Sequence, residues 1–287
     1  MADPKLKAAI TSGDLVLAPG VFELISAMIA DRIGFQALYV TGYGTVASYL
    51  GLPDAGLATY RDMIERIATI VQRTQTPVIA DADTGYGGLL NVRHTIRGYE
   101  DAGVSAIQME DQEFPKKCGH TKNRRVIPLA DMVRKIEVAV DSRRSDDFLI
   151  IARTDSRTGL GLDEAIRRGK AFAAAGADIV FVESPESEDE MRRVADEIDA
   201  PLFANMVNGG RTPLLSAARL KEIGYSVAIH PAVGFLAMGA ALQKAYADLK
   251  ENGETSDGID LYDFSAFNTL LGFEDVWAFE EKYAEAD

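Results

Sequence analysis

The sequence is poor in the residues that build disulfides and zinc sites. Its 287 residues include one cysteine, Cys118, and three histidines. No disulfide can form within the chain, which is typical of a protein in a reducing compartment, so we expect a cytoplasmic location. We expect no zinc site either, because no second cysteine is present and histidine is sparse.

Positive charge and long apolar runs are also scarce. The chain has 30 lysines and arginines against 44 aspartates and glutamates, a net charge of −14. Such a surface repels phosphate backbones and anionic membranes, so we expect neither nucleic-acid nor membrane partners. The most apolar stretch, residues 227–242, contains His230 and Pro231 and is too short to span a bilayer. An anionic metabolite stays possible where a metal ion or a few cations gather locally.

What the sequence does contain is an alternation of short apolar runs and longer segments of helical period. Several of these helical segments end at a glycine, a common helix stop. Continuous apolar runs are typical of strands that are covered on both faces, as in parallel sheets. We predict eight strands, at residues 15–21, 37–41, 77–83, 106–111, 148–155, 179–183, 201–206 and 227–230.

Eight strand–helix units favour an α/β fold, a (β/α)₈ TIM barrel, over residues 1–250. The alternative is a doubly wound open sheet. That fold usually carries a G-x-G-x-x-G fingerprint after its first strand, where this chain has Pro19-Gly20-Val21-Phe22 instead.

Residues 251–287 form a separate C-terminal extension. We predict a helical stretch over residues 260–282 that is rich in aromatics, and aromatics at that density need a partner surface. We expect it to pack on a neighbouring subunit, and the alternative is a helix that caps the same barrel. Its aromatic residues are Tyr262, Phe264, Phe267, Phe273, Trp277 and Phe279.

Carboxylates gather where the predicted strands end, which is the face of a barrel that carries active sites. Asp81 and Asp83 are two residues apart on one strand and share a face, Glu110 ends the next strand, and Asp54 lies in an earlier loop. Oxygen donors without histidine or cysteine favour Mg²⁺, with Mn²⁺ as a substitute, over zinc. The alternative is that these aspartates are helix N-caps.

Two further groups suggest chemistry at the same face. Cys118 follows two lysines and precedes Gly119 and His120, and nearby positive charge makes a thiol a usable acid or base. A lone cysteine is otherwise a small buried hydrophobe. Arg153 lies inside a strand and needs an anionic partner, either Glu183 or a substrate carboxylate.

These stretches resemble the isocitrate lyase/phosphoenolpyruvate mutase superfamily along essentially the whole chain. K-K-C-G-H combined with D-A-D-T-G-Y-G marks its lyase branch. The other matching motifs are Y-V-T-G-Y-G, L-G-L-P-D, M-E-D-Q, A-R-T-D, F-V-E-S-P and N-M-V.

The resemblance implies Mg²⁺-dependent retro-aldol cleavage of a 2-hydroxy acid and a homotetramer with a helix swapped between subunits. Asp81 would bind the metal directly, and Asp54, Asp83 and Glu110 through water. Thr41, Gly42, Tyr43 and Arg153 would bind the end of the substrate that becomes the 2-oxo acid, with Glu183 and Asn205 completing the pocket. Lys116, Cys118, Gly119 and His120 would lie on a gating loop, and Cys118 would protonate the carbanion.

The segment N-M-V-N-G-G-R-T-P at residues 205–213 resembles 2,3-dimethylmalate lyase and the petal-death protein. Bacterial 2-methylisocitrate lyases tend to have N-I-T-E-F-G there. The resemblance therefore favours a 2-alkylmalate that yields pyruvate and a carboxylic acid. 2-Methylisocitrate is the next choice, and oxaloacetate decarboxylation or phosphonopyruvate mutase chemistry are the remaining alternatives.

Overall fold

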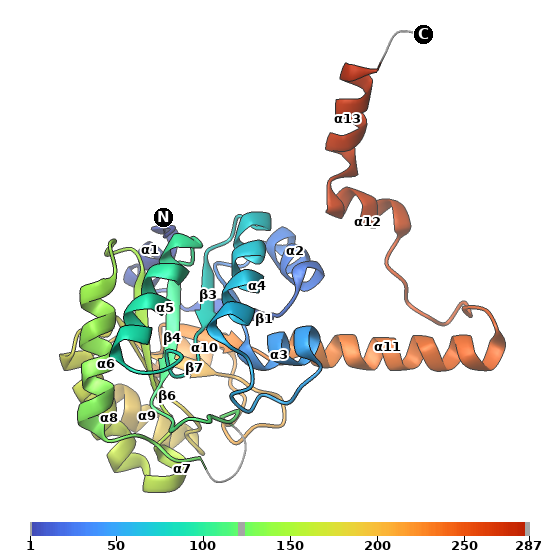
Figure 1. The fold of residues 1–287 in the computed structure, drawn as a ribbon. Coiled ribbons are helices and arrows are strands. Elements are labelled where there is room, and N and C mark those ends of the chain that lie inside the picture. Colours follow the sequence, from blue (N-terminus) through green and yellow to red (C-terminus); the bar gives the residue numbers. More distant parts are fainter. Residues whose placement is uncertain (1, 120–123, 285–287) are drawn as a thin grey trace. The chain divides into compact units, whose positions relative to one another are not determined.

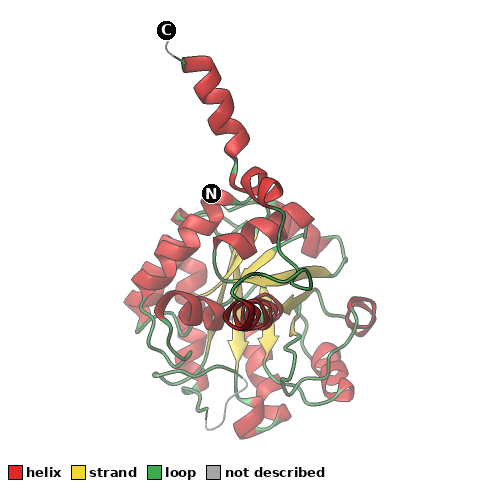
Figure 2. Cartoon of the chain, turned by 90° about the vertical axis from the view of Figure 1, so that its right-hand side faces the viewer, coloured by secondary structure: helices red, strands yellow, loops and turns green. Residues whose placement is uncertain are grey.

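The computed structural model describes residues 2–119 and 124–284, and within them the eight predicted strands are present. They form one parallel sheet in the order β6-β5-β4-β3-β2-β1-β8-β7. Figure 2 shows these strands inside a ring of helices. The strands are β1 Val16–Val21, β2 Leu38–Val40, β3 Val78–Asp81, β4 Ala106–Glu110, β5 Leu149–Thr154, β6 Ile179–Val182, β7 Phe203–Asn205 and β8 Val227–His230.

Helices separate the strands (Figure 1). Helix α1, Lys5–Thr11, precedes β1, and at least one helix follows every strand. They are α2 Leu24–Ile33 after β1, α3 Gly42–Leu50 and α4 Tyr60–Arg73 after β2, α5 Leu89–Asp101 after β3, α6 Leu129–Ser142 after β4, α7 Arg157–Leu160 and α8 Leu162–Ala174 after β5, α9 Glu188–Glu197 after β6, α10 Ala217–Ile223 after β7, and α11 Val233–Asn252 after β8.

The sheet curls into a barrel, which confirms the predicted (β/α)₈ fold. Strand β1 pairs with both β2 and β8, so the first and last parts of the sheet are adjacent. Strands β6 and β7 meet through one parallel bridge between Val180 and Leu202. The open-sheet alternative is therefore wrong, because an open sheet would leave β6 and β7 apart at its two edges.

Two buried layers hold the barrel together. Residues that alternate along the strands face either the helices or the barrel interior. The interior layer includes Phe181 and Phe203, whose rings lie 4.9 Å apart. Leu6 of α1 is fully buried in this layer against residues at the amino ends of the strands. One end of the barrel is thus filled, and the carboxyl ends of the strands carry the polar residues.

The remainder of the chain, residues 236–287, forms a second compact unit. The division falls within α11, whereas the predicted barrel domain ends at residue 250. Helix α11 ends at Asn252, and Gly253 follows it with a left-handed φ of 73°. The predicted single helical stretch is two helices, α12 Phe264–Leu271 and α13 Phe273–Tyr283, because Gly272 adopts a left-handed φ of 88° that ends α12. Among the described residues, no helix combines the length and apolar character that crossing a membrane requires.

Candidate active site

Strand register brings the predicted site residues to one mouth of the barrel. Asp81 ends β3 and lies opposite Gln108 of β4, and Glu110 ends β4 opposite Arg153 of β5. Asn205 ends β7. Because parallel strands end together, these side chains share the carboxyl-end face, where α/β barrels carry their chemistry.

Asp81 is fixed by contacts from three directions. Its Oδ1 accepts hydrogen bonds from the Asp83 amide at 3.0 Å and from Gln108 Nε2 at 3.4 Å, and its Oδ2 accepts from the Gly42 amide at 3.3 Å. Gln108 is itself held by the Tyr39 hydroxyl at 2.7 Å. Tyr39 and Gln108 are not among the site residues predicted from the sequence. The available signal was a glutamine within an otherwise apolar strand.

The remaining acids lie in buried positions around it. Asp83 adopts a left-handed φ of 48°, a conformation that costs free energy in a non-glycine residue.

The N-caps of α3, α4 and α5 are Thr41, Thr59 and Gly88. The N-cap alternative for these aspartates is therefore wrong at these helices.

Burial raises the pKa values of three carboxyl groups at this mouth, those of Asp81, Asp83 and Glu110. For Asp83, burial followed by repulsion from other carboxylates raises the pKa to about 7, although Lys116 opposes the rise. Burial also raises the pKa of Asp81, and it raises that of Glu110 well above the ordinary range. The mouth therefore strongly favours a nearby cation.

Lys116 supplies one such cation. Its Nζ lies 2.5 Å from Asp54 Oδ1 and 2.7 Å from Asp83 Oδ1, with the lysine side chain 3% exposed. Burial alone would lower the pKa of Lys116, but the carboxylates of Asp83 and Asp54 raise it well above the ordinary value. The resemblance places Lys116 on a gating loop, and in the structure its ammonium group bridges two of the predicted metal ligands.

The acids also fit a magnesium ion held mainly through water. In residues 2–119 and 124–284, no three histidine, cysteine, aspartate or glutamate side chains form a ready-made metal cluster. Magnesium commonly keeps several waters and takes one or two carboxylates. The negatively charged groups at this mouth are carboxylates, and Asp81, Asp54, Asp83 and Glu110 would hold the ion.

Arg153 and Glu183 form a second ionic cluster beside the first. Arg153 Nη2 lies 3.2 Å from Glu183 Oε2, and its Nε lies 3.3 Å from Glu110 Oε2. Asn205 Nδ2 donates to Glu183 Oε2 at 3.0 Å, and the Ser184 hydroxyl donates to its Oε1 at 3.0 Å. The strand-end glutamate is thus fully buried with a cation and two neutral donors.

The start of α3 approaches the acids closely. A Cβ on Gly42 would lie 2.5 Å from Asp81 Oδ2, so only glycine fits without a shift. Thr41, the N-cap of α3, is buried. Tyr43 is 42% exposed, and its ring stacks on Phe235 at 5.2 Å. Tyr43 therefore lies at the solvent-exposed side of this corner.

The segment after β4 folds back over both clusters. The amide of half-buried Cys118 donates to the Asp54 carbonyl at 3.2 Å. A Cβ on Gly119 would lie 2.1 Å from Arg153 Nη2 and 3.1 Å from Glu183 Cδ, so this glycine permits a close approach. His120 lies outside the described residues.

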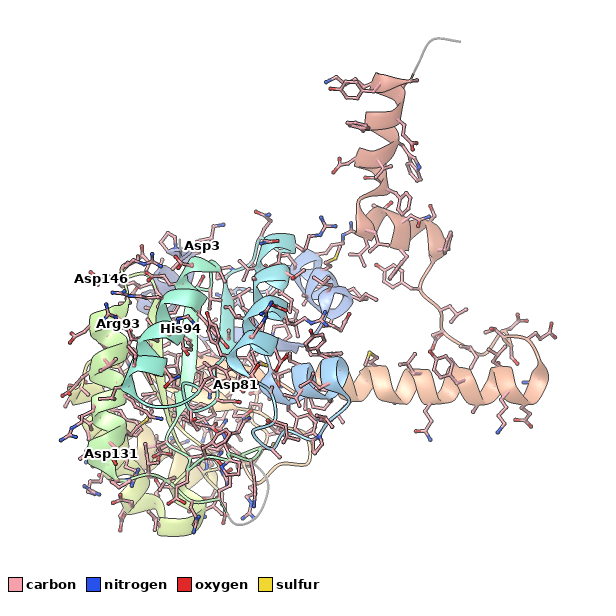
Figure 3. All side chains as sticks on the ribbon, viewed as in Figure 1. Asp3, Asp81, Arg93, His94, Asp131 and Asp146 are labelled. Atoms are coloured by element: carbon pink, nitrogen blue, oxygen red, sulfur yellow. The ribbon has the colours of Figure 1, made fainter. Side chains whose placement is uncertain are left out.

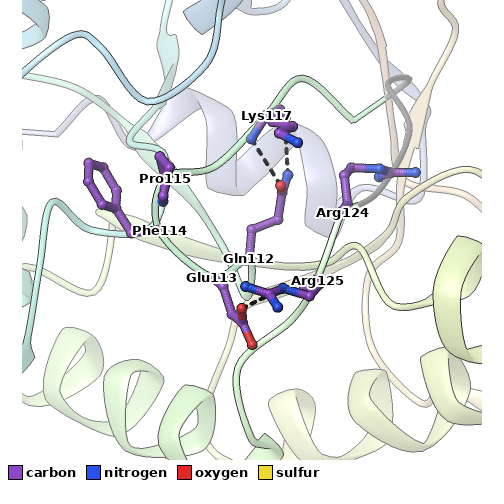
Figure 4. Close-up of a pocket in the computed structure, with 7 residues that line it drawn as sticks. All are labelled: Gln112, Glu113, Phe114, Pro115, Lys117, Arg124 and Arg125. Atoms are coloured by element: carbon purple, nitrogen blue, oxygen red, sulfur yellow. Dashed lines mark hydrogen bonds and ion pairs between the residues drawn. The ribbon is translucent and has the colours of Figure 1, made fainter.

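Two other features contain none of the predicted site residues, although one of them borders the acids, because Gln112 Nε2 donates to Glu110 Oε1 at 2.9 Å. A cavity of about 510 Å³ borders the segment after β4 (Figure 4) and contains none of the predicted site residues. His94 lies exposed on α5 (Figure 3) and packs on the Tyr60 ring. The cavity is lined by Gln112, Glu113, Phe114, Pro115, Lys117, Arg124 and Arg125.

Comparison with known proteins gives matches along the chain. The family model described as phosphoenolpyruvate phosphomutase matches residues 6–250. The chain is 46% identical to 2,3-dimethylmalate lyase of Eubacterium barkeri, covering 98% of this chain and 97% of that protein. It is 41% identical to 2-methylisocitrate lyase of Aeropyrum pernix, covering 98% and 89%. A crystal structure of 2,3-dimethylmalate lyase has a TM-score of 0.92 at 36% identity, covering 100% of this chain and 97% of that one.

The bridging position of Lys116 generates a stability prediction. In EDTA, Lys116→Met should lower the free energy of unfolding by about 3–5 kcal/mol, because it leaves buried carboxylates without their cation. Added MgCl₂ should restore part of this loss by supplying positive charge to the folded state. Urea denaturation with and without MgCl₂ measures both effects. Lys117→Met, at the exposed neighbour, should change stability by less than about 0.5 kcal/mol. Equal stability of Lys116→Met and wild type in EDTA would contradict the role of Lys116 as the cation that stabilises the buried carboxylates.

Proposed function

The chain belongs to the phosphoenolpyruvate mutase/isocitrate lyase superfamily, as its motifs predict, and on that premise we propose that it is a Mg²⁺-dependent lyase. It breaks a carbon–carbon bond in a 2-hydroxy acid that carries two or three carboxylates. One observation supports the proposal most strongly. The segment containing Cys118 and Gly119 contacts both groups of charged residues at the mouth. It reaches the carboxylates through Asp54 and the ionic cluster of Arg153 and Glu183 through Arg153.

The reaction is a retro-aldol cleavage. A general base takes the proton of the 2-hydroxyl group as its oxygen becomes a carbonyl, the C2–C3 bond breaks, and its electron pair moves into the carboxylate of the departing acid. When bound, Mg²⁺ would supply Lewis-acid stabilisation of the negative charge on the oxygens of the 2-oxo acid end.

The residues of the chain bind, orient and protonate. Arg153 pairs with the carboxylate at the 2-oxo acid end, together with the backbone at Thr41 and Gly42 and the side chain of Tyr43. Glu183 and Asn205 complete this pocket. Cys118 donates a proton to the carbanion left on the departing acid, and Lys116, Gly119 and His120 belong to the same segment.

The preferred substrate is a 2-alkylmalate such as 2,3-dimethylmalate, which cleaves to pyruvate and propionate. Support comes from the 46% identity to 2,3-dimethylmalate lyase over nearly all of both chains. 2-Methylisocitrate, which gives pyruvate and succinate, is the second candidate because of the 41% identity to a 2-methylisocitrate lyase.

We also propose that the C-terminal unit is an arm swapped between subunits of a homotetramer. Support comes from the large apolar side chains that the second unit exposes. Phe264 is 79% exposed and Phe279 is 63% exposed. Tyr262, Phe273, Trp277 and Tyr283 are exposed on the same unit.

A substrate panel tests the reaction. With MgCl₂, 2,3-dimethylmalate should give pyruvate, measured with coupled lactate dehydrogenase, and propionate, measured by NMR. EDTA should abolish turnover, and MgCl₂ or MnCl₂ should restore it. Parallel arms with 2-methylisocitrate, oxaloacetate and phosphonopyruvate distinguish the alternatives. Turnover that persists in EDTA would contradict the metal, and carbon dioxide from oxaloacetate as the only product would favour a decarboxylase.

Replacement of the proposed acid tests the mechanism. Cys118→Ser should lower kcat by about 10²–10⁴-fold, because a hydroxyl is a much weaker acid than a thiol, and KM should change little. Steady-state kinetics on the best substrate of the panel measure both constants. Unchanged kcat would remove Cys118 as the acid and would favour mutase-type chemistry, which needs no such proton.

Solution mass tests the arm. Light scattering should give about four times the 31.1 kDa of one chain. Phe279→Asp should shift the protein to smaller species, because it places a charge in an apolar interface, whereas Glu280→Ala at the next position should not. A monomer of wild-type protein would favour the alternative in which these helices cap their own barrel.

A further inference from the structure

Arg153 is paired with a buried carboxylate, Asp155, that has no role in the proposed reaction. Asp155 follows β5 and accepts two hydrogen bonds from Arg153. Arg153 Nε donates to Asp155 Oδ2 and Arg153 Nη2 donates to Oδ1, both at 2.9 Å. Two parallel bonds of this kind fix the plane of a guanidinium group as well as its position. The Asp155 side chain has no exposed surface.

This pairing determines which part of Arg153 is available to a substrate. The Phe181 ring lies 4.9 Å from the guanidinium carbon and covers one face of the group. Among the described residues, the hydrogen bonds of Arg153 use Nε and Nη2, and none uses Nη1. Rotation of the guanidinium would break both bonds to Asp155. Nη1 is therefore the donor that this arrangement presents to an incoming carboxylate.

Asp155 is held in turn from two sides. Arg124, the first described residue after position 119, forms a buried ion pair through its Nη1 with Asp155 Oδ1. Arg124 Nη2 also donates to the Thr158 hydroxyl at 2.7 Å. The backbone amide of Asp155 donates to Asp111 Oδ1 at 2.9 Å.

The local charges keep Asp155 ionised. Burial alone would raise the pKa of Asp155, but the guanidinium groups of Arg153 and Arg124 outweigh burial and lower it. A protonated Asp155 would lose one of its acceptor positions. The second arginine thus stabilises the form of Asp155 that can hold the first.

We propose that Asp155 is a positioning residue: it holds the Arg153 guanidinium in the orientation that receives the substrate carboxylate, and Arg124 holds Asp155. This inference rests on the proposed function, in which Arg153 binds the 2-oxo acid end of the substrate. Asp155 itself contacts neither the substrate nor the metal.

The test compares Asp155→Asn with wild type in two assays. The amide keeps the shape of the side chain and removes the charge and one acceptor. We expect kcat/KM for the best substrate of the panel to fall about 30–100-fold, with a rise in KM, because a misoriented Arg153 weakens binding as well as the reaction. Oxalate serves as a small dicarboxylate probe and is titrated by calorimetry in the presence of MgCl₂. Its affinity should fall by at least about tenfold.

A double-mutant cycle separates positioning from general destabilisation. If Asp155 acts through Arg153, then Arg153→Lys combined with Asp155→Asn should lose little more activity than the worse single variant. Multiplied losses would indicate that the two residues act independently and would overturn the proposal. Arg124→Gln keeps the Arg153–Asp155 pair and should cost about 3–10-fold in kcat/KM. It remains a usable test if Asp155→Asn fails to fold.

Asp178→Asn is the matched control. Asp178 forms a partly buried ion pair with Arg143 at 2.5 Å and accepts the Ile150 amide at 2.8 Å, near the amino end of β5. It should lower thermal stability while changing kcat/KM and oxalate affinity by less than about twofold. Wild-type kinetics and oxalate affinity in folded Asp155→Asn would overturn this inference alone. A wild-type protein that neither turns over any substrate of the panel nor binds oxalate would overturn the proposed function as well.

Discussion

The site depends on one electrostatic constraint, the burial of several carboxylates at a single mouth of the barrel. Asp81, Asp83 and Glu110 lie where water is scarce, and an ionised carboxylate in such a place needs a compensating cation. The chain provides Lys116 on one side and Arg153 on the other. The same constraint explains why the segment after β4 folds inward, since it carries the ammonium group that the acids require.

This constraint also reconciles the large negative net charge of the chain with an anionic substrate. A charge of −14 argues against nucleic acid and anionic membranes as partners, yet the proposed substrate is itself an anion. The field at the mouth is set by nearby buried groups rather than by the distant surface acids, which salt screens. Lys116 and Arg153 place positive charge beside these acids, and a bound divalent ion would add to it, so a locally negative cluster becomes able to receive a carboxylate.

The sequence predicted those parts of the molecule that depend on local pattern. All eight strands follow from apolar runs, and the position of Asp81, Glu110 and Asn205 follows from the rule that parallel strands end together. Pairings between distant residues could not be predicted in the same way. No local pattern in the sequence links Lys116 to Asp54. The sequence pattern predicts one helical stretch where the structure has α12 and α13, because a single glycine, Gly272, fits within a helical pattern as well as it ends one.

The division between strands and loops suggests where relatives with different substrates diverge. Strand ends supply the acids and Arg153, and the bonds of Gln108 and Asp155 restrain them, so a change at these positions would disturb several buried charges at once. Residues 206–213 follow β7 and contribute no charged group to these clusters, whereas the segment around Cys118 carries Lys116, which the buried acids require. Substrate choice can therefore change in the loop after β7 at little cost to the barrel, whereas the handling of the common carboxylate end is tied to the strands and to the segment around Cys118.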